Sequence, residues 1–302
     1  MKLGFVGLGR MGSNMVLRLI KTGHMPVVYN RSPEPGIALE KAGAERAEDY
    51  AELCGMLIAP RVIWIMVPAG RPVDGVIGAL LPHLAKGDTL IDGGNSNYLD
   101  SVRRCKLLKK KGMHFLDIGT SGGLEGARNG ACLTIGGDEK VYRKLVPLFR
   151  SLAAKHGFLH CGPSGAGHYV KTIHNGIEYS ILQAYGEGFS VLEAAPYRLN
   201  LAKIAAVWSH GSVIRSWLLE LAFREFRKSP RLSGIEGVVG GGETGDWAVR
   251  QAKRAKVRVP SMELALRERK RSARKPSFTG KVIAAIRNGF GGHSVMKRTK
   301  RQ

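Results

Sequence analysis

Four polar side chains that could move protons recur at helical spacing near the middle of the chain. They stand at positions i, i+3, i+4 and i+7 of one expected helix and are Lys171, His174, Asn175 and Glu178. Side chains at this spacing share one helix face. In a partly dry cleft a lysine can become neutral and act as a base, while a carboxyl group can be kept protonated as an acid. The stripe therefore predicts acid–base chemistry, and the competing interpretation is a solvated face held by a Lys–Glu pair.

A glycine-rich turn lies near the start of the chain. A short apolar run, residues 3–6, comes before it, and a helical pattern of apolar residues begins at Met11. The turn fits G-x-G-x-x-G at Gly7, Gly9 and Gly12. In dinucleotide-binding folds the first glycine makes the turn, the second lets the backbone approach a pyrophosphate, and the third lets helix and strand pack closely. We therefore predict a bound dinucleotide rather than a turn without a ligand.

The residues that end the second expected strand indicate which nicotinamide cofactor fits. A carboxylate at this place holds the ribose 2′-OH of NAD, whereas an arginine accommodates the 2′-phosphate of NADP. The chain reads Asn30-Arg31-Ser32, with no acid at Asn30. The Arg31 guanidinium can pair with a phosphate in fork geometry. NADP is thus favoured over NAD, and the alternative is an arginine on a solvated loop.

Two loops rich in glycine and small polar residues each follow an expected strand. They are residues 92–96, DGGNS, and residues 119–123, GTSGG. Open α/β sheets bind ligands at the carboxyl ends of their strands. Free backbone N–H groups with hydroxyl and amide side chains suit a polar substrate, although both segments could also be plain connecting turns.

The elements that must position these residues fall into two groups. In the first part of the chain, expected strands alternate with expected helices, which predicts a parallel, doubly wound Rossmann sheet with helices on both faces. From Gly165 onward strand signals nearly vanish. We therefore predict an α/β fold followed by an all-helical domain, with domains at residues 1–164 and 165–302 and a loose basic tail from Met296. The expected strands are 3–6, 26–30, 62–67, 89–91, 115–117 and 134–135. The expected helices are 11–20, 37–42, 99–111, 140–154, 169–195, 201–226, 247–256, 262–270 and 279–288.

Charge is the unusual feature of the composition. The chain carries 47 Lys and Arg against 24 Asp and Glu, a net charge of +23, and residues 201–302 contribute 23 − 7 = +16 of it. Such a field attracts nucleic acid, anionic membranes or small phosphorylated and carboxylated substrates. The four cysteines are scattered without a CxxC pair, which argues against a zinc site and favours a reducing compartment. No run of 18 apolar residues occurs, so we expect a cytoplasmic protein without membrane partners.

The ordered blocks of the chain resemble those of the decarboxylating 6-phosphogluconate dehydrogenase family in its short form, within the β-hydroxyacid dehydrogenase group. The resemblance spans residues 7–293 and rests on the blocks GLGRMG, NRS, DGGNSNYLDS, GTSGGLEGARNG, GHYVKTIHNGIEY and RNGFGGH. It implies oxidation of 6-phosphogluconate by NADP at C3, loss of C1 as CO2, and release of ribulose 5-phosphate, a step of the pentose phosphate pathway and of gluconate utilization. No metal is expected, because a 3-keto acid already has an electron sink.

The resemblance also implies roles for individual residues. Lys171 would be the base at the 3-hydroxyl, and Glu178 the acid that protonates C1 of the enediol. The residues expected to contact the cofactor are Gly7, Leu8, Gly9, Arg10, Met11, Gly12, Asn30, Arg31, Ser32, Val67 and Asn95. Those expected to hold the substrate are Asn95, Ser121, Gly122, Gly123, His174, Asn175, Tyr179, Arg287 and His293.

By the same resemblance, Arg287 and His293 would reach the substrate phosphate of a neighbouring subunit, which implies a homodimer or a dimer of dimers. The chain departs from the family pattern where Asp246 replaces a basic residue. The spacing from Trp247 to Pro260 is also longer than is usual in the family. The sequence therefore leaves open which arginine takes the role of the family's substrate-site arginine. The candidates for that role are Arg267, Arg269 and Arg271.

Two other functions compete with this interpretation. A related β-hydroxyacid dehydrogenase would oxidise a small unphosphorylated 3-hydroxy acid without decarboxylation, but the DGGNS block and the Arg287–His293 block weigh against it. A nucleic-acid-binding protein on a dehydrogenase fold would use the net positive charge. Only 7% of the residues are aromatic and the basic run from Arg267 to Lys275 contains none, so base stacking has little support.

Overall fold

The computed structural model describes residues 1–296, and the chain forms two compact units. The first unit is Met1–Thr172 and the second begins at Ile173. Helix α8 (Ala166–Glu193) is continuous and contributes its first turns to the first unit and the rest to the second. The domain boundary at residues 164 and 165 stays a prediction. Of the predicted basic tail, all but Met296 lies outside the described residues.

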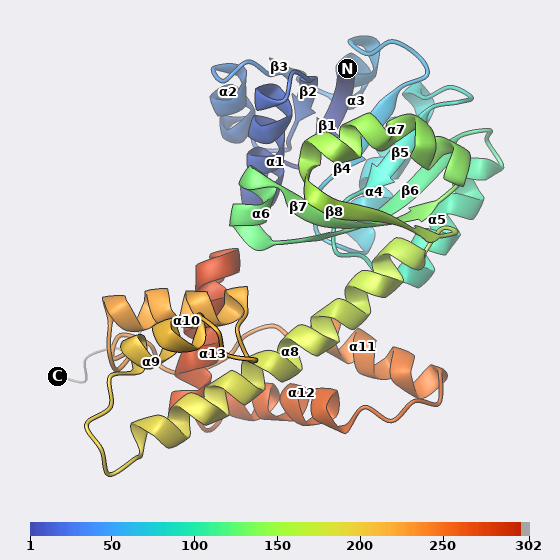
Figure 1. Cartoon of the computed structure of the whole chain (residues 1–302). Coiled ribbons are helices and arrows are strands. Elements are labelled where there is room, and N and C mark those ends of the chain that lie inside the picture. Colours follow the sequence, from blue (N-terminus) through green and yellow to red (C-terminus); the bar gives the residue numbers. More distant parts are fainter. Residues whose placement is uncertain (297–302) are drawn as a thin grey trace. The chain divides into compact units, whose positions relative to one another are not determined.

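The first unit contains a twisted sheet flanked by helices (Figure 1). Among the described residues it has eight strands in the order β3-β2-β1-β4-β5-β6-β7-β8. Neighbouring strands are parallel except β6 and β7, which are antiparallel. The strands are β1 (Lys2–Val6), β2 (Met25–Tyr29), β3 (Glu45–Arg46), β4 (Val62–Ile65), β5 (Thr89–Asp92), β6 (His114–Ser121), β7 (Ala131–Gly137) and β8 (Ala153–Gly162).

The prediction of a wholly parallel sheet was wrong at β7. Only residues 122–130 connect β6 to β7, and a parallel crossover needs a dozen or more residues. The short α6 (Gly123–Asn129) fills this connection, so the chain turns back antiparallel. The strand β8 was missed because most of its residues are exposed or half-buried and therefore show no apolar run.

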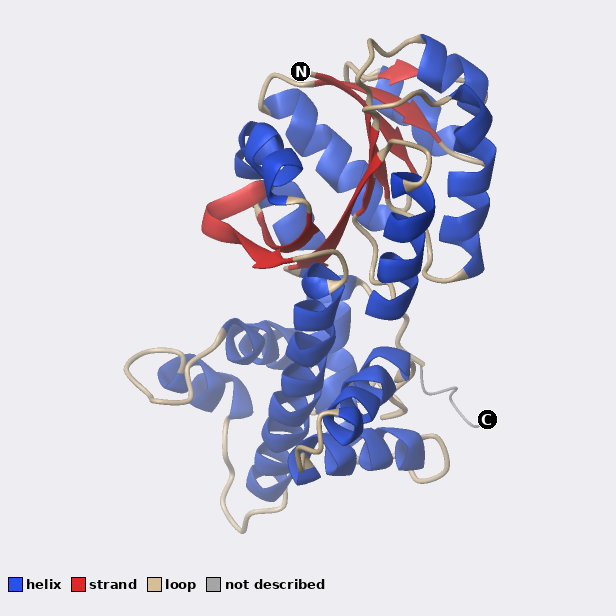
Figure 2. Cartoon of the chain, turned by 90° about the vertical axis from the view of Figure 1, so that its right-hand side faces the viewer, coloured by secondary structure: helices blue, strands red, loops and turns tan. Residues whose placement is uncertain are grey.

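Helices cover both faces of this sheet (Figure 2), as the doubly wound prediction requires. Residues of adjacent positions in β4 face opposite cores, with Trp64 in the core under α1, α6 and α7, and Ile63 and Ile65 in the core under α3, α4 and α5. This alternation places one buried strand between two apolar layers. The remaining helices of the unit are α1 (Arg10–Lys21), α2 (Glu34–Glu40), α3 (Tyr50–Gly55), α4 (Arg71–Leu80), η1 (Leu81–His83), α5 (Tyr98–Lys109) and α7 (Glu139–Leu152).

The second unit is helical in its described part. Phe189, Phe226 and Ile286 lie at the centre of its core. The helical pattern predicted for residues 201–226 is two helices, because Ser216 caps a new start by accepting a hydrogen bond from the Leu219 N–H. Besides α8, the helices are α9 (Leu201–Trp208), α10 (Trp217–Lys228), α11 (Glu243–Arg254), α12 (Pro260–Ser272) and α13 (Phe278–Gly291). Within residues 1–296, no helix combines the length and the apolarity that a membrane crossing needs.

Candidate active site

The glycine-rich turn lies where the sheet order reverses, between β1 and β4. A Cβ atom on Gly7 would lie 2.4 Å from the Met66 carbonyl oxygen and 2.8 Å from the Val67 side chain. A Cβ atom on Gly12 would lie 2.1 Å from the Gly7 carbonyl oxygen. No heavy atom lies within 4 Å of the corresponding position on Gly9. Two of the glycines are thus required by packing, whereas Gly9 faces open space, as a backbone that approaches a pyrophosphate must.

Asn30 connects the loop after β2 to this turn. Its Oδ1 accepts a hydrogen bond from the Leu8 N–H at 2.9 Å, and its Nδ2 donates to the Ser32 carbonyl oxygen. Leu8 is buried in the core, so a cofactor could meet only its backbone. Arg31 is exposed and makes no ion pair within residues 1–296. The structure therefore brings the two predicted cofactor loops together and leaves a cation available beside them.

Within the DGGNS loop, Asn95 alone presents its side chain to solvent. Asp92 and Ser96 are buried, and the Ser96 hydroxyl donates to the Asp92 carboxylate at 2.7 Å. Arg104, also buried, donates to Asp92 at 3.1 Å and to Asp74 at 2.8 Å. The Ser96 hydroxyl, predicted from the sequence to suit a polar substrate, therefore shapes the loop together with the Asp92 carboxylate. Arg104 was missed, because nothing in the sequence distinguishes it from the surface arginines.

Lys171 is buried against strand β6, where Gly119 has no side chain to keep it away. A Cβ atom on Gly119 would lie only 2.3 Å from the Cβ of Lys171 and 2.5 Å from the Thr134 hydroxyl. The same hydroxyl donates to the Gly167 carbonyl oxygen at 2.9 Å. The predicted substrate loop Ser121, Gly122 and Gly123 begins two residues after Gly119, at the end of β6. In the first unit, the predicted base and the predicted substrate loop thus adjoin.

The remaining members of the stripe lie on the part of α8 that belongs to the second unit. The Nδ1 atom of His174 lies 3.9 Å from a Glu178 carboxylate oxygen and 3.4 Å from the Asn175 amide oxygen. Asn175 is buried, whereas the His174 side chain is 47% exposed and that of Glu178 19% exposed. A half-buried carboxyl beside an imidazole can exchange a proton with a ligand at this face.

Arg269 is the only one of the three open arginine candidates that is buried, with 4% exposure. Its Cζ lies 3.6 Å from the centroid of the Tyr179 ring, and its Nη1 has no hydrogen-bond partner among the described residues. Burial lowers the pKa of this guanidinium to about 10, and the charge of Arg287 acts in the same direction. Arg271 instead pairs with Glu268 at 3.5 Å, and Arg267 is exposed.

Arg287 lies in the same neighbourhood of the second unit. Its Nη1 donates to the Gly240 carbonyl oxygen at 2.7 Å. Burial lowers the pKa of its guanidinium, while the charges of Tyr179 and Glu178 raise it. Neither Arg269 nor Arg287 has a carboxylate within ion-pairing distance in residues 1–296, although the charge of Glu178 raises the pKa of both guanidinium groups. A buried cation and a half-buried one, both without an ion-pair partner among the described residues, are typical of a site for an anionic ligand.

The other residues of this region have partners of their own. The Tyr179 hydroxyl lies 3.1 Å from that of Thr244, and a Cβ atom on Gly245 would lie 2.4 Å from the Tyr179 ring. Asp246, which departs from the family pattern, pairs with Arg250 at 2.6 Å and with Lys270 at 3.8 Å. His293 is exposed, and its ring meets Phe290 edge-on. Asp246 is therefore occupied by cations of α11 and α12.

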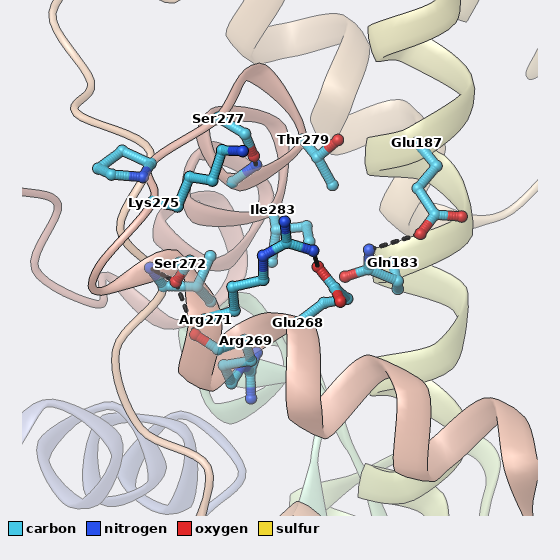
Figure 3. Close-up of a pocket in the computed structure, with 13 residues that line it drawn as sticks. Gln183, Glu187, Glu268, Arg269, Arg271, Ser272, Lys275, Ser277, Thr279 and Ile283 are labelled. Atoms are coloured by element: carbon cyan, nitrogen blue, oxygen red, sulfur yellow. Dashed lines mark hydrogen bonds and ion pairs between the residues drawn. The ribbon is translucent and has the colours of Figure 1, made fainter.

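A pocket of about 260 Å³ lies between α8, α12 and the start of α13 (Figure 3). Arg269 lines it, but Glu178, Tyr179 and Arg287 do not. Its carboxylates are already engaged, Glu187 with the Gln183 amide at 2.7 Å and Glu268 with Arg271. Of the residues predicted from the sequence for the substrate, only the arginine candidates Arg269 and Arg271 line this pocket.

Comparison with known proteins agrees with this geometry. The profile described as the NAD binding domain of 6-phosphogluconate dehydrogenase matches residues 2–162, and that of the 6-phosphogluconate dehydrogenase C-terminal domain matches residues 167–282. YqeC of Bacillus subtilis (strain 168), provisionally named a 6-phosphogluconate dehydrogenase, is 44% identical over 298 residues, which cover 99% of this chain and 100% of that protein. The NAD(+)-dependent, decarboxylating 6-phosphogluconate dehydrogenase of Haloferax volcanii is 43% identical over 300 residues, 99% of each chain.

A solved structure covers the whole chain as well. The 6-phosphogluconate dehydrogenase of Plasmodium falciparum, described in its apo form and in complexes with NADP+ and with 6-phosphogluconate, superimposes with a TM-score of 0.84 at 29% identity. The match covers 100% of this chain and 67% of that one. The predicted fold class and the family resemblance are thereby confirmed. The chain belongs to the decarboxylating 6-phosphogluconate dehydrogenase family and is an NAD(P)-dependent oxidoreductase.

Proposed function

We propose that the protein oxidises 6-phosphogluconate at C3 with NADP and releases ribulose 5-phosphate and CO2. The observation that carries the proposal is the stripe on the continuous helix α8, with buried Lys171 at one position and half-buried Glu178 seven residues later. An oxidative decarboxylation needs a base and an acid that act in succession. Both groups are carried by the same helix, seven residues apart.

In this mechanism the neutral Lys171 amine removes the proton of the 3-hydroxyl, and the nicotinamide of NADP would accept the C3 hydride. The ammonium of Lys171 then returns the proton to the 3-keto oxygen as the bond from C1 to C2 of the sugar acid breaks and CO2 leaves. Glu178 protonates C1 of the resulting enediol, which was C2 of the substrate, while the hydroxyl on the former C3 gives its proton back to Lys171, and the ketone ribulose 5-phosphate results. Asn175 and His174 orient the substrate through hydrogen bonds.

The preference for NADP is supported by Arg31, which is exposed and free of ion pairs in residues 1–296, beside the turn whose Gly9 faces open space. A guanidinium there can bind a 2′-phosphate that NAD lacks. The relative from Haloferax volcanii is named NAD(+)-dependent, so NAD is the second candidate. Initial rates with each cofactor at saturating 6-phosphogluconate decide between them.

The substrate phosphate is proposed to bind Arg269 and Arg287. Both are desolvated cations without carboxylate partners in the described part of the chain, and the Nη1 of Arg269 still lacks an acceptor. A phosphate would supply several acceptors at once. This selects Arg269 from the three arginines that the sequence left open.

The family resemblance has Arg287 and His293 serving a neighbouring subunit, whereas Arg287 here contacts Gly240 of its own chain. We propose that Arg287 acts within its own subunit and that His293 is the residue available to a neighbour. Co-expression of Lys171→Ala and Arg287→Ala chains tests this. If Arg287 acted across the dimer, about one quarter of the sites would be restored by random pairing. We expect no recovery.

A homodimer, or a dimer of dimers, is supported by apolar side chains exposed along one face of α8. Ile177, Ile181 and Val191 are 49%, 37% and 71% exposed. Such a stripe favours contact with another copy. Light scattering should show a smaller particle for Val191→Glu than for the control Ile58→Glu, which changes a residue of the first unit that is 86% exposed.

All four cysteines are free thiols, which supports a reducing compartment such as the cytoplasm.

The experiment that tests the whole proposal measures NADP reduction together with CO2 trapped from 6-phosphogluconate labelled at C1. We expect equal amounts of both products. Reduction without CO2 would favour the related β-hydroxyacid dehydrogenase. No reaction with either cofactor, together with tight binding of duplex or single-stranded nucleic acid at physiological salt, would favour the nucleic-acid-binding alternative, which we do not expect.

A further inference from the structure

The first turn of α8 is held from two directions by buried groups that the mechanism does not use. From β6, the Asp117 carboxylate accepts hydrogen bonds from the Gly165 N–H at 2.6 Å and the His168 N–H at 3.0 Å. From the loop after β5, the Gly94 carbonyl oxygen lies 3.2 Å from Nε2 of His168. Asp117 and His168 are both 0% exposed. The helix start is therefore constrained before Lys171 is reached, one turn later.

The imidazole of His168 uses both of its nitrogen atoms. Nδ1 lies 2.7 Å from the Ser101 hydroxyl at the start of α5, and Nε2 faces the Gly94 carbonyl. A carbonyl only accepts, so Nε2 donates its proton to the Gly94 carbonyl oxygen, and the Ser101 hydroxyl is the partner of Nδ1. Both ring nitrogen atoms thus have a partner, and the two contacts fix the orientation of the ring. A buried polar group with every partner in place specifies one arrangement of its surroundings.

The Gly94 carbonyl belongs to the peptide bond that continues into Asn95, the exposed side chain of the DGGNS loop. Lys171 follows His168 by three residues on the helix. One hydrogen bond therefore joins the backbone beside Asn95 to the helical turn that bears Lys171. The loop lies close to the residues that follow β4, since a Cβ atom on Gly94 would lie 3.1 Å from the Val67 carbonyl oxygen.

We propose that His168 is a positioning residue, which sets the separation of Lys171 from Asn95 through its hydrogen bond to the Gly94 carbonyl oxygen. The inference rests on the proposed roles of Lys171 and Asn95. Because His168 is fully buried in the first unit, it acts through these two residues and not on the substrate. Errors of about 1 Å in the placement of a catalytic group lower turnover by about 100-fold.

Two amide variants separate the contacts of His168. The Gln amide nitrogen can replace Nε2 and donate to the Gly94 carbonyl, whereas the shorter Asn amide can replace only Nδ1 toward Ser101. We expect His168→Gln to keep kcat within about 3-fold of the parent, and His168→Asn and His168→Leu to lose about 10- to 100-fold in kcat. The dissociation constant of NADP, measured by fluorescence titration, should change less than about 3-fold in all of them.

Controls keep the test independent of folding and of the proposed function. Thr172→Val removes a buried hydrogen bond of the same helical turn, from the Thr172 hydroxyl to the His168 carbonyl, and should leave kcat unchanged. Ser101→Ala keeps the imidazole and removes only its second partner, so it reports on the network even if His168→Leu does not fold. We expect a fall of about 3- to 10-fold in kcat for Ser101→Ala.

Three outcomes would overturn the inference: parental kcat in His168→Asn, a His168→Gln enzyme as slow as His168→Asn, or parental kcat in Ser101→Ala. A Lys171→Ala enzyme measured in parallel identifies the other kind of failure. If that enzyme retained turnover, the proposed mechanism itself would be wrong. If it were inactive while the His168 and Ser101 variants matched the parent, the positioning role alone would fail.

Discussion

Around Lys171 the geometry is decided by missing side chains, whereas around Arg269 it is decided by an aromatic ring. Gly119 lets the lysine lie against β6, and Gly7 and Gly12 let the first helix lie against its strand. In the second unit, the Tyr179 ring covers the Arg269 guanidinium, and Gly245 makes room for that ring. Backbone turns thus place the groups of the first unit, and side-chain stacking places those of the second. Substitution of Lys171 should therefore mainly lower kcat, whereas substitution of Arg269 should mainly raise KM for the substrate.

The largest effect is expected at Lys171. Lys171→Ala removes the proposed base and should lower kcat by about 10³-fold or more, while the affinity for NADP stays unchanged. Stopped-flow measurement of cofactor reduction, with separate titration of cofactor binding, checks both parts. Turnover near that of the parent would show that Lys171 is not the base. The expected contrast between a kcat effect in the first unit and a KM effect in the second would then fail.

Arg269 should respond in KM for the substrate. Arg269→Lys keeps the charge but loses the planar contact with Tyr179 and the fork geometry, so KM for 6-phosphogluconate should rise by about 10- to 100-fold. Arg267→Lys, at an exposed position of the same helix, is the matched control and should behave as the parent. Steady-state kinetics with saturating cofactor measure the difference, and equal KM values for the two variants would exclude Arg269 from the phosphate site.

Arg31 should affect one cofactor only. Arg31→Ala is expected to raise KM for NADP by about 10-fold and to leave KM for NAD unchanged, because only NADP loses a charge partner. Arg10→Ala, at an exposed position next to the pyrophosphate turn, serves as the comparison and should affect both cofactors alike. Parallel changes for the two cofactors in Arg31→Ala would contradict the 2′-phosphate assignment.

The smallest effect concerns the ion pairs behind the DGGNS loop. Burial raises the pKa of the Asp74 carboxyl, hydrogen bonds from Arg104 and Arg103 lower it, and the net pKa lies below its ordinary value of 3.8. The stabilising contribution is therefore present above that value and lost as the pH falls through the lowered pKa. Asp74→Asn should cost about 1 kcal/mol at pH 7, since Asp92 still faces Arg104, and less at pH 3.

Urea unfolding at the two pH values measures this difference. Glu34→Gln, an exposed acid of the first unit, is the control and should show no such dependence. A cost for Asp74→Asn that is larger at pH 3 than at pH 7 would contradict the sign of the linkage.

Local patterns predicted much of this protein. The glycine spacing at Gly7, Gly9 and Gly12 indicated the turn, and the i, i+4 and i+7 spacing placed Lys171, Asn175 and Glu178 on one helix. Each is determined by residues close together along the chain. The direction of β7 was not predicted, because it follows from the short connection after β6 and hydrophobic periodicity does not report strand direction. The strand β8 was not predicted, because its half-exposed residues show little hydrophobic periodicity.

By itself the sequence determined the family, the dinucleotide turn and the shared helix face, since local spacing specifies all three. Only the tertiary structure decided which arginine is desolvated, where Arg287 lies in its own chain, and that His168 joins α8 to the DGGNS loop. The physical reason is that burial and hydrogen-bond partners depend on segments far apart in the chain: 74 residues separate His168 from Gly94, and 47 separate Arg287 from Gly240. No local pattern encodes such a contact.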